Sequence, residues 1–197
     1  MLILGLTGKI ASGKDFVAKI LEDYGAHLID ADKIGHELLQ KGSNAYNEIV
    51  DEFSEKILDE EKNIDRIQLA LEVFKNKTSL EKLNRINHPK LKKIVIEKLK
   101  DAEKKNANVI VINAAILKEI GLLPLVDKVW VIDAEDDDII RRLTEKGLTM
   151  EDAIQRLNSQ ASSSEYRKLG DEIIENKSTL MDLQKKVENL IKTLSLN

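Results

Sequence analysis

The 197-residue chain contains no cysteine, which excludes disulfides, thiolate catalysis and cysteine-type zinc sites. It also lacks any run of about 18 apolar residues, so no segment is expected to cross a membrane as a helix. Its first residues, MLILGLTG, include no basic segment, and we therefore expect no signal peptide and a cytoplasmic location. A strong charge of one sign is missing too: with a net charge of −4 and a pI of about 5.6, no nucleic-acid partner is expected.

Short apolar segments alternate with longer amphipathic stretches along the chain. The segments VIVI at 109–112 and VWVI at 129–132 are nearly continuous apolar runs, typical of strands buried on both faces of a parallel sheet, and we expect Trp130 in the core. Shorter apolar segments occur at 2–6, 26–29 and 173–174. Apolar residues follow helical spacing at 15–24, at 34–39, over most of 43–106 and over most of 136–194. The last of these regions ends in a predicted helix over 180–194. Within the last region, SQASSSE at 159–165 predicts a mobile loop. Strands alternating with helices predict an α/β fold around a parallel sheet.

Residues 8–15 read GKIASGKD and carry the glycine spacing and the lysine of a phosphate-binding loop. Gly8 and Gly13 allow the backbone to curl so that successive N–H groups point at one anion. Lys14 adds positive charge for the outer phosphates, and the helix that begins near it contributes the positive end of its dipole. We therefore predict a P-loop NTPase-type sheet flanked by helices. The expected nucleotide-binding residues are Gly8, Lys9, Ile10, Ala11, Ser12, Gly13, Lys14 and Asp15.

Asp15 stands where the usual loop motif has serine or threonine. In the first turn of a helix a carboxylate gains roughly 0.3–1 kcal/mol from the helix dipole. About 5 Å from a phosphate charge it is repelled by roughly 3 kcal/mol at an effective dielectric of about 20. Because the repulsion is larger, a cation is needed between the two groups, and Mg²⁺ prefers oxygen ligands. Asp15 is therefore the predicted metal ligand, and nucleotide binding is expected to depend unusually strongly on Mg²⁺.

Asp30 and Asp32 follow the second predicted strand. In an open α/β sheet the carboxyl ends of the strands face the ligand crevice, so a carboxylate there can reach an acceptor molecule or the metal. One of the two could receive a proton from an acceptor hydroxyl. The alternative is that both are helix-capping or turn residues.

Five stretches together make the chain similar to the dephospho-coenzyme A kinase family. They are GLTGKIASGKD at 5–15, LIDADKIGHELL at 28–39, LNRINHPKL at 83–91, RLNSQAS at 156–162 and GDEIIEN at 170–176. The resemblance spans almost the whole chain. It implies ATP-dependent phosphorylation of the ribose 3′-hydroxyl of dephospho-coenzyme A, giving coenzyme A.

The same resemblance implies roles for individual residues. Asp32 would be the general base or hydroxyl-orienting group, with Lys14 and Arg142 as the other catalytic residues. Asp30, Asp32, His88 and Pro89 would bind the acceptor. Taken alone, His88 is more typical of a helix end, because the residue before a proline disfavours helical conformation.

The resemblance also implies one domain with two specialised regions. Residues from about 33 to 105 would form a mainly helical acceptor-binding insertion, and residues from about 140 to 165 a lid that contains Arg142. ATP and Mg²⁺ are the expected cofactors, and dephospho-coenzyme A is the expected small-molecule partner. We expect no nucleic-acid or membrane partner, and a monomer or weak homo-oligomer.

The chain departs from the usual family pattern at several positions. Lys9 replaces a glycine, Asp15 a serine or threonine, and Asn113 an acidic residue. Residues 115–117 read Ala-Ile-Leu in place of Pro-Leu-Leu, and Lys146 stands roughly where the lid has a further arginine. Lys9 and Lys146 can keep positive charge near the phosphates. Asn113 can orient a metal-bound water but supplies no charge, so we hypothesise that Asp15 partly compensates for it.

Three alternatives remain open at the level of sequence. A kinase for another nucleotide-like acceptor shares the loop and the lid, although the Asp-Ala-Asp and His-Pro pieces favour the coenzyme A precursor. A noncatalytic relative that binds nucleotide or coenzyme A fits the changes at Asp15 and Asn113. A GTP-binding switch would use Asp32-Lys33-Ile34-Gly35 and Asn176-Lys177, but Thr179 lacks the carboxylate that reads guanine.

Overall fold

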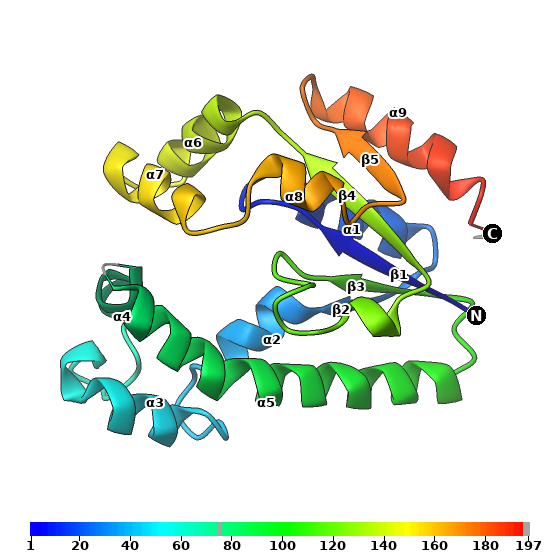
Figure 1. Cartoon of the computed structure of the whole chain (residues 1–197). Helices are drawn as coiled ribbons and strands as arrows, with labels where there is room; N and C mark the ends of the chain where they lie inside the picture. The colour runs from blue at the N-terminus through cyan, green and yellow to red at the C-terminus, as the bar shows by residue number, and fades with distance from the viewer. Residues whose placement is uncertain (75, 195–197) are drawn as a thin grey trace. The chain divides into compact units, whose positions relative to one another are not determined.

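The structure is a computed structural model that describes residues 1–74 and 76–194 (Figure 1). The chain divides into two compact units, one formed by Met1–Asp30 with Lys98–Asn197 and the other by Ala31–Glu97. The acceptor-binding insertion expected at about 33–105 overlaps the second unit, and its function stays a prediction.

The first unit is built on five parallel strands in the order β2-β3-β1-β4-β5. The predicted α/β fold with a parallel sheet is therefore confirmed, and each apolar segment forms one strand. The strands are β1 (Leu2–Thr7), β2 (His27–Asp30), β3 (Val109–Asn113), β4 (Lys128–Asp133) and β5 (Glu172–Glu175).

The register brings polar residues to one edge of this sheet. Asn113 is the register partner of both Asp30 in β2 and Leu6 in β1, and Asp133 pairs with Glu175. Because all the strands run in the same direction, their carboxyl ends lie at the same edge. The loop after β1 also leaves the sheet there, so it is placed beside Asn113.

Helices α1 and α9 cover one face of the sheet (Figure 1). Their apolar faces contribute residues such as Leu21 and Val187 to a core that includes Trp130, which is 1% exposed as predicted. The helical elements of the first unit are α1 (Lys14–Asp23), the short η2 (Leu123–Leu125), α6 (Asp136–Glu145), α7 (Met150–Asn158), α8 (Ser163–Arg167) and α9 (Leu180–Ile191).

The second unit is mainly helical and contains no strand among its described residues. Ile49 and Val95 in this unit are fully buried. Its helical elements are α2 (Ala31–Glu37), α3 (Tyr46–Phe53), η1 (Glu55–Ile57), α4 (Arg66–Phe74) and most of α5 (Lys77–Lys104), which continues into the first unit. No described helix of either unit is long and apolar enough to span a membrane.

Two local interpretations differ from the structure. Taken alone, His88 is more typical of a helix end, but α5 runs through both His88 and Pro89. A proline inside a helix costs one backbone hydrogen bond, and the many other turns of this 28-residue helix outweigh that local loss. The predicted mobile loop at 159–165 is also partly helical, because Ser162 caps α8 through a reciprocal pair of hydrogen bonds with Glu165.

Candidate active site

The loop between β1 and α1 requires glycine at two positions. Gly8 has a φ of +151°, and a Cβ there would lie 2.3 Å from the carbonyl oxygen of Ile132. Gly13 has a φ of +105°, and a Cβ there would lie 2.5 Å from Nδ2 of Asn176. Any side chain at either position would therefore meet both backbone strain and a steric clash. The spacing of the two glycines reflects this geometry.

Side chains from distant parts of the chain hold the loop backbone. Asn176, which follows β5, is 3% exposed and donates from Nδ2 to the carbonyl oxygen of Ser12 at 2.7 Å. Arg142 of α6 donates from Nη1 to the carbonyl oxygens of Ala11 and Ser12 at 3.1 and 3.3 Å, and from Nη2 to that of Asn176 at 3.4 Å. The guanidinium predicted to act in catalysis is thus attached to the loop itself.

Lys14, Asp15 and Asn113 form a contiguous polar group at the start of α1. The Lys14 Nζ lies 2.9 Å from Oδ1 of Asp15, and Nδ2 of Asn113 donates to the same oxygen at 3.0 Å. Desolvation raises the pKa of Asp15, but the charge of Lys14 and the hydrogen bond from Asn113 outweigh it, and the pKa lies below its usual value. The carboxylate is therefore ionised at neutral pH.

Among the residues that the structure describes, several buried oxygens around the loop have no hydrogen-bond partner. They are Oγ of Ser12, Oδ1 of Asn113 and Oδ1 of Asn176, on residues that are 0, 1 and 3% exposed. Buried polar atoms are nearly always paired in folded proteins, so such a cluster indicates a place for a polar ligand. A phosphate can accept from the serine hydroxyl, and a hydrated cation can donate to the amide oxygens.

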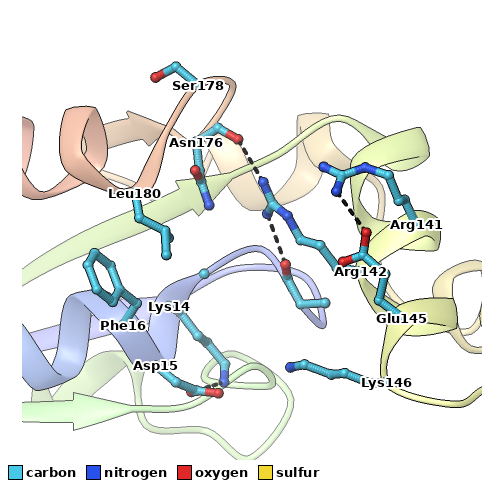
Figure 2. Close-up of a pocket in the computed structure, with 12 residues that line it drawn as sticks. Lys14, Asp15, Phe16, Arg141, Arg142, Glu145, Lys146, Asn176, Ser178 and Leu180 are labelled. Carbon is cyan, nitrogen blue, oxygen red and sulfur yellow. Dashed lines mark hydrogen bonds and ion pairs between the residues drawn. The ribbon is translucent and has the colours of Figure 1, made fainter.

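A cavity of about 500 Å³ opens beside the loop (Figure 2). Lys14, Asp15 and Lys146 line its charged side, and Figure 2 shows the Lys146 side chain extending toward the first two. Phe16 and Leu180 lie next to each other on another wall and supply apolar surface. A cavity of this size with one cationic and one apolar side suits a nucleotide.

The structure brings some of the predicted site residues together and places others elsewhere. Ala11, Gly13, Lys14, Asp15 and Arg142 line the cavity. The remaining loop residues, Gly8, Lys9, Ile10 and Ser12, form the turn behind it. The ammonium of Lys9 lies 2.6 Å from Oδ1 of Asp136, so its expected contact with phosphate stays a prediction.

The predicted acceptor residues occur in both units. Asp30 ends β2 in the first unit, beside Asn113 in the sheet. Asp32 lies in the first turn of α2, and His88 and Pro89 lie within α5, all in the second unit. Their roles stay predictions.

Sequence reasoning missed several residues of the site. Asn176 and Gln160 occur in quoted motifs but received no role there, although Asn176 holds Ser12 and Gln160 accepts from the backbone N–H of Ile10 at 2.8 Å. Phe16 and Leu180 were read only as apolar positions of helices, and both line the cavity. For Asn176 and Gln160, their place in the quoted motifs is a sequence feature that indicates a role in the site.

A phosphate loop joining the first strand to the first helix of a parallel sheet, beside a cavity of nucleotide size, defines a P-loop nucleotide-binding protein. The sequence profile of the dephospho-CoA kinase family matches residues 2–182. The dephospho-CoA kinase of Fusobacterium nucleatum subsp. nucleatum is 42% identical over 196 residues, covering 98% of this chain and 99% of that protein. The chain belongs to the dephospho-CoA kinase family.

Solved structures agree with this assignment. A dephospho-CoA kinase from Campylobacter jejuni has a TM-score of 0.69 and 31% identity, with 98% of this chain and 96% of that one covered. A shikimate kinase from Acinetobacter baumannii in complex with shikimate has a TM-score of 0.56 and 15% identity, with 100% and 96% covered. The second likeness shows only that the fold is shared with another kinase.

Proposed function

We propose that this protein transfers the γ-phosphoryl group of ATP to the ribose 3′-hydroxyl of dephospho-CoA, giving coenzyme A. The observation that carries the proposal is a built phosphate loop beside a nucleotide-sized cavity in a chain that belongs to this family from end to end. The dephospho-CoA kinase family implies a nucleotide donor, and ATP is the donor proposed here.

The cationic residues around the cavity suit phosphoryl transfer. This reaction is catalysed mainly by positioning and by neutralising the charge that spreads over the phosphate oxygens. Lys14, Lys146 and Arg142 line the cavity, and Arg142 also donates to the loop carbonyl of Ala11. We propose that Lys14 and Lys146 contact the outer phosphates. Residues from about 140 to 165, which include both α7 and Arg142, are proposed as the lid that excludes water from the reaction.

Mg²⁺ fits the donor set next to Lys14. Asp15 supplies a carboxylate, and the unpartnered Oδ1 of the buried Asn113 supplies a neutral oxygen. The described residues contain no cluster of three or more His, Cys, Asp or Glu that would hold a metal by itself, so phosphates and water must complete the shell. When bound, the ion would neutralise phosphate charge. It would also remove the repulsion between the phosphates and Asp15.

Asp32 is the proposed acceptor-side group. Its carboxylate lies in the first turn of α2, directly after the strand β2 that ends at Asp30. A carboxylate there can orient the 3′-hydroxyl and take its proton as the new P–O bond forms and the bond between the γ-phosphorus and ADP breaks. His88 and Pro89 of α5 are proposed to bind the rest of dephospho-CoA, within the acceptor-binding region at about 33–105.

The test is an ADP-release assay with ATP, Mg²⁺ and dephospho-CoA, run on the wild type and on Asp32→Asn. We expect turnover that requires dephospho-CoA and falls by about 10²- to 10⁴-fold in the variant. Asp137→Asn, which changes an exposed aspartate in the first turn of another helix, is the matched control and should retain wild-type turnover. Adenosine monophosphate replaces dephospho-CoA in a parallel reaction.

Two other results would redirect the assignment. Turnover with adenosine monophosphate but not with dephospho-CoA would indicate a kinase for another acceptor. Nucleotide binding without any turnover would favour the noncatalytic relative. The contact between Lys14 and Asp15 supports this alternative, because it occupies the lysine of the phosphate loop. Asp15 would then be the first residue to revert to serine.

A further inference from the structure

The phosphate loop contains a turn that is strained by its sequence. The backbone N–H of Ser12 donates to the carbonyl oxygen of Lys9 at 3.1 Å, which closes a four-residue turn. Its third residue, Ala11, has a φ of +55°. Turns with a left-handed residue at this position usually have glycine or asparagine there, because a Cβ makes the conformation unfavourable. Such a conformation persists only when the surroundings hold it in place.

Residues of the α6–α7 region hold every residue of this turn. Asp136 at the start of α6 pairs with Lys9 at 2.6 Å, and the carboxamide Oε1 of Gln160, which follows α7, accepts from the Ile10 N–H at 2.8 Å. Arg142 donates to the carbonyl oxygens of the last two residues of the turn. The turn therefore depends on contacts that come from about 130 to 150 positions further along the chain.

Apolar packing supports the same attachment. The side chains of Ile10 and Ala11 pack against a buried cluster that α6 and α7 form with the residue after β4. The cluster consists of Ala134, Ile139, Leu143, Ala153 and Leu157. Because the tip of the turn packs on this cluster, the hydrogen bond from Ile10 to Gln160 is partly shielded from water. Removing the acceptor of a partly buried hydrogen bond costs more free energy than removing that of an exposed one, because the donor is left without a partner.

We propose that Gln160 is a positioning residue for nucleotide binding. It acts through the loop, because it is not among the described residues that line the cavity and its carboxamide oxygen accepts from the backbone N–H of Ile10. By holding Ile10, it keeps the strained turn in the conformation from which Ser12, Gly13 and Lys14 are presented to the phosphates. This inference rests on the proposed binding of ATP.

The test compares ATP affinity, measured by calorimetry with Mg²⁺, in the wild type and in Gln160→Met. Methionine has a similar length but no strong acceptor, and the variant should bind ATP about 3- to 10-fold more weakly. KM for ATP should rise, whereas kcat and KM for dephospho-CoA should stay at wild-type values. Gln184→Met, at an exposed glutamine of α9, is the matched control and should change neither.

A second substitution separates positioning from simple loss of stability. Ala11→Gly removes the penalty on the left-handed conformation, so the turn needs less support. In the Ala11→Gly background, Gln160→Met should weaken ATP binding by less than 2-fold, which is clearly less than its effect in the wild-type background. An equal loss in both backgrounds, or no loss with Gln160→Met alone, would overturn the proposal. If the wild type itself does not bind ATP, the proposed function fails together with the inference.

Discussion

Asp15 contacts both a cation and an amide, although its side chain is 76% exposed. Lys14 neutralises it from one side, and Asn113 donates to the same carboxylate oxygen from the end of β3. The hypothesis that Asp15 compensates for Asn113 thus concerns two side chains in direct contact.

We expect Asp15→Ser to weaken the dependence of nucleotide binding on Mg²⁺. Without the carboxylate, ATP alone meets less repulsion, so the ratio of affinities with and without Mg²⁺ should fall by about 10-fold. This change is smaller than the unscreened charge interaction would produce, because the Asp15 side chain is exposed to solvent and ions. Calorimetric titration with and without the ion measures this ratio. An unchanged ratio would remove the basis for assigning Asp15 to the metal.

Turnover of the same variant tests the exchange between the two residues. Asp15→Ser alone should lose much of the activity, because Asn113 leaves the site without a carboxylate. Adding Asn113→Asp should restore part of the activity, because it places a carboxylate at a side chain that contacts residue 15 in the wild type. The coupled ADP-release assay compares the single variants with the double variant. No recovery in the double variant would reject the exchange.

At the scale of single elements, helix α8 depends on its first turn. Its five residues are too few for a stable isolated helix, so the cap formed by Ser162 and Glu165 is decisive. Hydrogen bonds from the side chain and backbone of Ser162 lower the pKa of Glu165 below its ordinary value of 4.5. A carboxylate with a lowered pKa in the folded state stabilises the protein above the ordinary pKa, and that contribution is lost as the pH falls through the folded-state pKa.

We expect Ser162→Ala to destabilise the protein by about 1 kcal/mol at pH 7, the usual cost of losing an N-cap. The difference between the variant and the wild type should shrink as the pH falls below 4.5, where Glu165 becomes protonated in both. Urea unfolding followed by the fluorescence of the buried Trp130 measures both values. Thr78→Ala, at an exposed hydroxyl residue within helix α5, serves as the control.

At the scale of the whole molecule, ATP should raise the thermal stability fully only when Mg²⁺ is also present. At about 100 times its dissociation constant, a ligand stabilises the folded state by about 2.7 kcal/mol. For a chain of this length that corresponds to an increase in Tm of roughly 5–10 °C. ATP with Mg²⁺ should produce this shift, and ATP with a chelator should produce a much smaller one because Asp15 repels the phosphates. Equal shifts with and without the ion, measured by scanning fluorimetry, would contradict the coupling.

The sequence by itself determined the class of fold and the location of the phosphate loop. Both follow from local patterns: buried parallel strands appear as short apolar runs, and the loop needs Gly8, Gly13 and Lys14 at fixed spacing. The cap on α8 was also encoded locally, because Ser162 and Glu165 stand three positions apart. The spacing of Ser162 and Glu165 therefore indicates a helix start inside the loop expected at 159–165.

Only the tertiary structure decided which residues support the loop. Gln160 and Asn176 are separated from it by 150 or more positions, and no periodicity within a segment indicates which backbone atoms they contact. The contact between Asn113 and Asp15 likewise depends on the register of β3 against β1, which places the end of one strand beside the loop that follows the other. Strand order and helix packing are set by burial of apolar surface across the whole chain, so contacts at the sheet edge follow from the assembled fold and not from neighbours in sequence.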